Sequence, residues 1–145
     1  MKVKECMCNK VACVKPGTTL NNIAKIMQEQ HVGCIPVCDA NNNVLGLITD
    51  RDIVLRGVAF NKDVNTSPVS EIMTTNVQTI TPEAEVAEAS QIMCDCQIKR
   101  VPVVENETIV GMITLGDLAN VAKGNQVTKA VEGICRCGNN TQNNQ

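Results

Sequence analysis

The sequence predicts a mixed α/β (α+β) fold in which two copies of one βαββα unit pack with pseudo-two-fold symmetry. Two observations predict it. The chain of 145 residues matches itself when it is shifted by 66 positions. Within each copy, short apolar stretches alternate with stretches whose apolar residues recur every three or four positions, as they do in strands and amphipathic helices. A unit of about 65 residues buries little surface alone, so we expect the copies to pack as one body.

The duplication is carried by short motifs that recur in the same order. The shift of 66 positions aligns Ile35-Pro36-Val37 with Val101-Pro102-Val103. After one deletion in a turn the shift becomes 65, and GLITDRD at 46–52 then aligns with GMITLGD at 111–117. Both heptads read Gly-x-x-Thr-x-x-Asp. The chain is therefore a tandem repeat.

The first copy can be followed element by element. Pro16 and Gly17 have the chemistry of a turn, and Thr19 has that of a helix N-cap. Apolar residues then recur at i, i+3, i+4 and i+7, which places them on one face of a helix. Asp39-Ala-Asn-Asn-Asn43, between two apolar runs, indicates a hairpin loop. The predicted elements are a strand at 11–14, a helix from 20, strands at 34–38 and 44–48, and a helix from about 49 to 57.

The second copy repeats this order. Its predicted elements are a strand at 77–80, a helix that contains Val86, Ala89 and Met93, strands at 101–104 and 108–113, and a helix from about Thr114. In each copy a strand, a helix and a strand follow one another, which favours a right-handed crossover and a parallel strand pair.

The domain boundaries follow from the repeats. We expect the first repeat at residues 1–60, a linker at 61–68 and the second repeat at 69–124. Apolar residues spaced as on one helix face predict a C-terminal helical extension at 125–137, and the polar residues at 138–145 predict a disordered tail.

Composition and charge exclude several classes of partner. The net charge is −2, and neither repeat has the dense basic face that nucleic acids or anionic membranes require. Phe60 is the only aromatic residue, so bases cannot stack on a set of aromatic rings. The apolar runs are far shorter than the roughly 20 residues of a membrane span, and the charged start lacks the apolar core of a signal peptide. We therefore expect a cytoplasmic protein without nucleic-acid or membrane partners, whose nine cysteines are reduced.

The motifs together resemble those of a tandem CBS-domain pair, the Bateman module, over about residues 3 to 123. The resemblance rests on Glu-x-Met at 5–7 and at 71–73, on the two x-Pro-Val strands and on the two heptads. It implies a stand-alone CBS-domain protein whose repeats pack through their sheets and leave two clefts between them. Such modules bind adenosine-containing ligands such as AMP, ADP, ATP or S-adenosylmethionine and regulate another protein. The resemblance also implies a homodimer that requires no cofactor.

The heptads allow two interpretations. Thr-x-x-Asp at a helix start is a capping box, in which Thr49 accepts a first-turn amide and Asp52 accepts the amide of Thr49. A cap leaves Gly46 and Gly111 unexplained. Exposed first-turn amides and the helix dipole also form a site for an anion. In the family the aspartate holds the ribose, so by resemblance the candidates are Asp52 and Asp117, with Thr49 and Thr114 beside them.

Cations near the heptads are candidates for binding the phosphates. The first copy has Arg51 before its motif aspartate, and the second copy has Lys99 before its x-Pro-Val strand. Both positions face the phosphates in some family members, so each copy retains one candidate cation. Arg100 is a further candidate. The alternative is that all three are solvated surface charges.

The adenine base, by resemblance, lies between short apolar segments. Main-chain groups there can bind the edge of the base while aliphatic side chains cover its faces. Plain core packing is the alternative, and it is favoured for Ile35 and Val101. The candidate segments are Val11-Ala12-Cys13, Val77-Gln78-Thr79, Cys34-Ile35-Pro36 and Arg100-Val101-Pro102.

The cysteines support a competing interpretation. Four thiolates from two Cys-x-Cys pairs would form a zinc or iron–sulfur site if the pairs met in space, although zinc pairs are usually spaced Cys-x-x-Cys. We expect no metal site, and a cysteine-based metal or redox sensor stays an alternative, as does a ligand-free interaction module. The pairs are Cys6 and Cys8, Cys94 and Cys96, and Cys135 and Cys137.

Catalysis is not expected from this sequence. His31 is the only histidine, and its place near the end of the first long helix is explained by a C-terminal cap. A nucleophile in a recognisable relation to it and a pair of catalytic carboxylates are not apparent. We therefore expect a regulatory protein rather than an enzyme.

Overall fold

The computed structural model of the chain describes residues 1–121 and 125–134, which fall into two compact units. Among the described residues, the first unit is Ala12–Val77, and the second unit is Met1–Val11 together with the residues from Gln78 to Ile134. Each unit combines helices with one two-stranded antiparallel sheet, as the predicted mixed fold requires. The units do not coincide with the sequence repeats, because the start of the first repeat belongs to the second unit.

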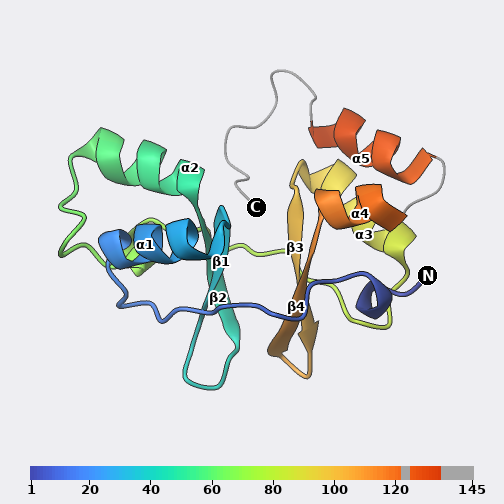
Figure 1. Ribbon diagram of the computed structural model, residues 1–145, viewed down its shortest axis with the longest axis horizontal. Coiled ribbons are helices and arrows are strands. Elements are labelled where there is room, and N and C mark those ends of the chain that lie inside the picture. The colour runs from blue at the N-terminus through green and yellow to red at the C-terminus, as the bar shows by residue number, and fades with distance from the viewer. Residues whose placement is uncertain (122–124, 135–145) are drawn as a thin grey trace. The chain divides into compact units, whose positions relative to one another are not determined.

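The first unit is built around one helix and one hairpin (Figure 1). Thr19 caps the first helix by accepting the amide of Asn22 at 3.4 Å, and His31 ends this helix in the left-handed conformation, as its C-cap. Both caps agree with the sequence prediction. The elements are α1 (Leu20–Gln30), β1 (Cys34–Cys38), β2 (Val44–Thr49) and α2 (Asp50–Asp52), which continues as the helical turns η2 (Ile53–Gly57) and η3 (Val58–Phe60), and later η4 (Val69–Glu71).

The hairpin of the first unit is closed by Asp39. Its Oδ1 accepts the amides of Asn41 at 2.8 Å and Asn43 at 3.0 Å, an arrangement in which an aspartate side chain holds a tight turn. The hydrogen bond from the Asn43 amide is the main reason that the pKa of Asp39 lies below its usual value. The hairpin loop predicted at this stretch is confirmed.

The strands predicted at 11–14 and 77–80 are wrong. Each stretch contributes a single parallel bridge, Val14 to Val37 in the first unit and Ile80 to Val103 in the second. The parallel direction agrees with the prediction, but the pairing does not extend. A proline follows two residues after each bridge, and it has no amide with which to continue the pairing.

The second unit repeats the helix and hairpin and adds one helix. Its elements are η1 (Val3–Glu5), α3 (Val86–Cys96), β3 (Arg100–Glu105), β4 (Thr108–Thr114), α4 (Leu115–Val121) and α5 (Asn125–Ile134). The last of these forms most of the extension predicted at 125–137, whereas its remainder and the tail predicted at 138–145 lie outside the described residues. Within the described ranges no helix combines the length and the apolar character that crossing a bilayer demands.

Each unit has its own apolar core. The first core contains Val14, Leu20, Ile23, Met27, Ile35, Val37, Ile48, Val69 and Ile72. The second contains Val3, Ile80, Val86, Ala89, Met93, Ile98, Val101, Val103, Ile113, Leu118 and Ala130. Burial of these side chains supplies the main favourable free energy of folding for each unit.

The two copies exchange their N-terminal segments. Val3, from the first copy, lies in the core of the second unit, whereas the equivalent Val69 lies in the core of the first unit. The Val3 amide donates to the Ala84 carbonyl at 2.9 Å, and the Val69 amide donates to the Thr18 carbonyl at 2.8 Å. Figure 1 shows the N-terminal turn near the start of α3. Each unit is therefore completed by a segment of the other copy.

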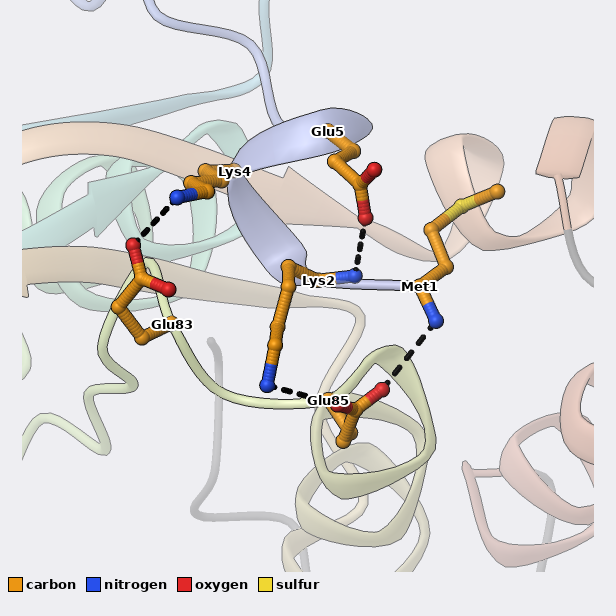
Figure 2. Close-up of polar contacts among 6 residues, drawn as sticks. All are labelled: Met1, Lys2, Lys4, Glu5, Glu83 and Glu85. Atoms are coloured by element: carbon orange, nitrogen blue, oxygen red, sulfur yellow. Dashed lines mark hydrogen bonds and ion pairs between the residues drawn. The ribbon is translucent and has the colours of Figure 1, made fainter.

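Charged side chains add to the contact made by the first of these segments. Lys2 Nζ lies 2.8 Å from Glu85 Oε1, and Lys4 pairs with Glu83 (Figure 2). Hydrogen bonds between these partners raise the pKa of both lysines and lower the pKa of both glutamates. All four side chains are about half exposed, so each pair stabilises the contact only modestly.

The stretch at 61–68, expected as a linker, covers the start of α1. The Leu20 amide donates to the Ser67 carbonyl at 3.1 Å, and the Asn21 amide donates to the Val64 carbonyl at 2.8 Å. These contacts satisfy two of the amides that a helix start leaves without intrahelical partners.

Candidate functional site

Both heptads fold into reciprocal capping boxes. In the first unit the Asp52 amide donates to Thr49 Oγ1 at 3.1 Å, and the Thr49 amide donates to Asp52 Oδ2 at 3.0 Å. In the second unit the Asp117 amide donates to Thr114 Oγ1 at 3.1 Å, and the Thr114 amide donates to Asp117 Oδ2 at 2.9 Å. The spacing Thr-x-x-Asp is thus explained by the start of a helix in each copy.

The first-turn amides of α2 already have partners within the protein. The Asp50 amide donates to the Gly33 carbonyl at 3.0 Å, the Arg51 amide to Asp50 Oδ1 at 2.9 Å, and the Asp52 amide to Thr49. The expectation of exposed amides that await an anion is therefore wrong for this helix. A ligand in the first unit would have to be bound by side chains or by other main-chain groups.

Asp52 is fully buried beside a cation that the sequence reading missed. Its side chain is 0% exposed, and Arg56 Nε lies 3.8 Å from its Oδ1. Arg56 also donates from Nη1 to the Ile72 carbonyl at 3.3 Å, which ties it to the next segment of the unit. The signal was available, because an acid and a base four residues apart meet on one helix face. Asp52 is therefore a buried acid with an ion-pair partner.

Asp117 has a different environment from Asp52. Its side chain is only partly buried, and the position equivalent to Arg56 is Val121. The cap uses Oδ2, and among the described residues none donates a hydrogen bond to Oδ1. The Leu115 amide donates to the Lys99 carbonyl at 2.8 Å, which holds the start of α4 against the residue that precedes β3. The second copy therefore presents the more accessible carboxylate.

The candidate cations lie close in the fold to the caps of their own units. Arg100 stands directly opposite Thr114 in the register of β3 and β4, and the exposed Lys99 precedes it. Arg51 is exposed on α2, two residues after Thr49. With Asp50, Val54 and Leu55 it lines a surface depression of about 360 Å³. In each unit, the candidate cations and the Thr–Asp cap therefore lie at the same end of the hairpin.

The segments proposed to hold the base are divided between the units. Their main chains run beside the x-Pro-Val strands, since the Val14 amide donates to the Pro36 carbonyl at 3.0 Å and the Ile80 amide to the Pro102 carbonyl at 3.1 Å. Ile35 and Val101 are core residues, at 1% and 0% exposure, so their side chains are not available to a ligand. The first unit holds Ala12, Cys13, Cys34, Ile35, Pro36 and Val77, and the second holds Val11, Gln78, Thr79, Arg100, Val101 and Pro102.

The heptad glycines are explained by close packing. A Cβ atom on Gly46 would lie 2.7 Å from the Thr74 carbonyl oxygen and 2.8 Å from Met73 Sδ. A Cβ atom on Gly111 would lie 2.7 Å from Met7 Sδ and 2.9 Å from the Cys8 carbonyl oxygen. The methionine of each Glu-x-Met motif therefore packs against the glycine of the heptad that shares its unit. These two motifs, which define the repeat, are in contact.

The cysteines of the described residues do not assemble into a metal centre. In residues 1–121 and 125–134, no three side chains of histidine, cysteine, aspartate or glutamate are placed to share an ion. Burial raises the pKa of the Cys6 and Cys96 thiols, which favours their protonated forms. Cys135 and Cys137, the third Cys-x-Cys pair of the sequence, lie outside the described residues.

Comparison with known proteins matches both copies. The CBS domain family matches residues 3–58 and again residues 69–124. The CBS domain-containing protein YhcV of Bacillus subtilis is 42% identical over 117 residues, which are 81% of this chain and 82% of that protein. Hypoxic response protein 1 of Mycobacterium tuberculosis is 32% identical over 125 residues, which are 86% and 87% of the two chains.

Solved structures give the same result. The crystal structure of hypoxic response protein I with two coordinated zinc ions has a TM-score of 0.78 at 31% identity, and covers 85% of this chain and 100% of that one. The CBS domain pair of protein MJ0100, in complex with 5′-methylthioadenosine and S-adenosyl-L-methionine, has a TM-score of 0.76 at 27% identity, with 83% and 94% covered. CBS-pair proteins are regulatory ligand-binding modules. On this evidence the chain belongs to the CBS domain family and carries two CBS repeats in tandem.

Proposed function

We propose that this chain is a stand-alone regulatory module of the cytoplasm that binds an adenosine-containing ligand, namely AMP, ADP, ATP or S-adenosylmethionine. Membership of the CBS family and the two matched Thr–Asp pairs support this proposal. The module acts by binding rather than by catalysis. A ligand that binds one conformation more tightly shifts the population toward it, and a protein target responds to that shift.

The accessible carboxylate of Asp117 is the observation that carries the proposal. Oδ1 of Asp117 is available to accept hydroxyl groups of a ribose, while Oδ2 keeps its bond to the Thr114 amide. Asp52 is less suited to this role because it is fully buried and paired with Arg56. We therefore place the preferred ribose site in the second copy, at Thr114 and Asp117.

The phosphates of a nucleotide would meet the cations of the same copy. Arg100 lies opposite Thr114 on the neighbouring strand, and Lys99 is exposed beside it. A guanidinium and an ammonium group both bind phosphate oxygens by charge-assisted hydrogen bonds. The second copy therefore favours a nucleotide over an uncharged nucleoside, whereas the first copy has one candidate phosphate ligand, Arg51, because its Arg56 is paired with Asp52.

Calorimetric titration with AMP, ATP, S-adenosylmethionine and 5′-methylthioadenosine tests the site. We expect Asp117→Asn to weaken binding by roughly 10- to 100-fold, because one charge-assisted hydrogen bond is worth about 1.5 to 3 kcal/mol. Asparagine keeps an oxygen for the Thr114 amide, so the cap persists. The control is Asp52→Asn, the same substitution at the equivalent position of the first copy. This variant should bind the ligand with nearly the affinity of the parent protein.

The phosphate assignment has its own readout. Lys99→Ala should weaken the binding of AMP more than the binding of 5′-methylthioadenosine, because only AMP carries a phosphate. Equal loss for both ligands would mean that Lys99 does not bind the phosphate. If the parent binds none of the four compounds, the proposal is wrong and the capping boxes serve the fold alone.

A metal sensor on the same scaffold is the second candidate. It is favoured by the similarity to hypoxic response protein I, whose crystal structure contains two coordinated zinc ions. Elemental analysis of protein purified without oxygen tests it. Zinc or iron at one or two atoms per chain would support a metal site, and metal far below one atom per chain would exclude this candidate.

A homodimer is the proposed assembly. Val54, Leu55, Val58 and Phe60, between α2 and the end of η3, are 44% to 72% exposed. Large apolar side chains that gather on one surface often mark an interface. Light scattering should therefore give twice the mass of one chain, and Val58→Glu should shift the protein toward the monomer. A parent that stays monomeric at high concentration would rule out this assembly.

A further inference from the structure

One position separates the surroundings of the two heptad aspartates. The caps themselves are alike, since threonine and aspartate exchange the same two hydrogen bonds in both copies, at 2.9 to 3.1 Å. The residue four positions after the aspartate differs, because it is Arg56 in the first copy and Val121 in the second. Residues four apart share one face of a helix, so a cation there meets the carboxylate and a valine cannot pair with it.

Arg56 covers the carboxylate of Asp52. Its Nε lies 3.8 Å from Oδ1, the oxygen that the cap does not use. The Asp52 side chain is 0% exposed and the Arg56 side chain is 35% exposed, so the guanidinium lies on the solvent side of the acid. A second contact holds it there, because Nη1 donates to the Ile72 carbonyl at 3.3 Å. Arg56 therefore occupies the oxygen whose equivalent in Asp117 is proposed to accept the ribose.

The second copy keeps the surroundings of this contact and lacks only the cation. The residue equivalent to Ile72 is Cys6, and each of them ends a single 3-10 turn as its C-cap. At the position of the arginine, the partly buried Val121 ends α4. The fold of a repeat therefore does not require an arginine at this position, and the one in the first copy calls for a separate explanation.

We propose that Arg56 is a specificity-determining residue that closes the first copy to adenosine ligands, so that each chain binds one ligand molecule, in its second copy. This inference rests on the proposed function. A ribose hydroxyl that displaced Arg56 would replace an ion pair with a hydrogen bond from a neutral group. It would also leave the guanidinium without its partner. In the second copy the ribose meets no such competitor.

Exchanging the two residues between the copies tests the inference. Calorimetry with AMP and with uncharged 5′-methylthioadenosine gives the number of bound molecules and the affinity. Arg56→Val gives the first copy the residue of the second, and it should raise the number bound from one to two per chain. Val121→Arg gives the second copy the ion pair, and it should weaken the binding of 5′-methylthioadenosine about 10-fold or more.

Two controls make the test specific. Asp52→Asn, added to Arg56→Val, should return the number bound to one, because the new site depends on that carboxylate. Ala119→Arg places the same charge two residues after Asp117, on a different side of α4. It should leave the affinity for 5′-methylthioadenosine unchanged. Circular dichroism shows whether each variant is folded, and Val121→Arg decides the question even if Arg56→Val does not fold.

The outcomes separate this inference from the proposed function. A parent that binds two molecules per chain, a folded Arg56→Val that still binds one, or a folded Val121→Arg that binds as the parent does would overturn the role of Arg56 and leave the proposed function standing. A parent that binds neither compound would reject the proposed function for these ligands, and the inference would fall with it.

Discussion

Gly46 lies in β2, at the point where the backbone of Thr74 passes close to this strand. An added Cβ atom would meet a main-chain oxygen at 2.7 Å, and that oxygen cannot move without shifting the Thr74 segment. We therefore expect Gly46→Ala to destabilise the protein by about 1 to 3 kcal/mol, the usual cost of overpacking. Urea unfolding measured by circular dichroism gives the difference.

Gly17 is the matched control for this prediction. A Cβ atom there meets nothing within 4 Å, so Gly17→Ala should leave the stability unchanged or raise it slightly. Equal effects at Gly17 and Gly46 would contradict the packing explanation. The sequence showed the threonine and aspartate of the heptad as a cap, because both partners lie within one helical turn. It could not explain the glycine, whose neighbour Thr74 is 28 residues away.

At the scale of elements, α5 comes closest to α3 at Gly133. A Cβ atom on Gly133 would lie 2.5 Å from the Cys94 carbonyl oxygen, and the Gln97 side-chain amide donates to the Gly133 carbonyl at 2.9 Å. Gly133→Ala should therefore loosen α5 from its unit. Hydrogen exchange of residues 127–134 should become faster, while α1 keeps its protection. Glu132→Ala changes an exposed neighbour and should leave the exchange rates as they are in the parent.

The ion pairs of the N-terminal segment predict a loss of protection in acid. The pKa values of Glu83 and Glu85 are lowered in the folded state, so their contribution is complete above the ordinary glutamate pKa of about 4.3. It is lost as the pH falls through the lower folded values. Protection factors of the Val3 and Lys4 amides should therefore fall in acid.

The second copy provides the control for these ion pairs. The amides of Val69 and Ser70 make the equivalent backbone hydrogen bonds, at 2.8 and 3.1 Å, but Gly17 and Thr19 stand where the first contact has Glu83 and Glu85. Their protection factors should change less over the same pH range. Parallel loss at all four amides would assign the acid effect to the whole fold instead of the ion pairs.

The elements could be predicted to different degrees. α1 was evident from its apolar face and its capping Thr19, and α3 from its apolar face, because these signals are local. The stretches at 11–14 and 77–80 have the apolar ends of a strand, yet each forms only one bridge. An apolar run becomes a strand only where the neighbouring strand offers it several main-chain hydrogen-bond partners. That number is set by the tertiary structure and cannot be read from the run itself.

At the scale of the whole molecule, the exchange of segments predicts which unit a truncation damages. Removing residues 1–8 deletes Val3 from the core of the second unit, although these residues are the start of the first copy. Hydrogen exchange should become faster in α3, β3 and β4 and stay nearly unchanged in α1, β1 and β2. Faster exchange confined to the first unit would contradict the exchange of segments.

The repeats were predictable from the sequence, but this exchange was not. Alignment shows that Val3 is equivalent to Val69, and it carries no information about which copy each residue packs on. Prediction of the candidate site from the sequence had the same limit. Thr49, Asp52, Thr114 and Asp117 were found as motif residues, whereas the burial of Asp52 beside Arg56 required the folded environment.

The path of the chain also sets an order of events during synthesis. The first unit is complete once Val77 has left the ribosome, so it can fold while the rest of the chain is still being made. Residues 1–8 are made before the first unit but find their neighbours last, because Cys8 pairs with Met112. The segment that completes the second unit therefore waits, without its partners, for most of the translation of the chain.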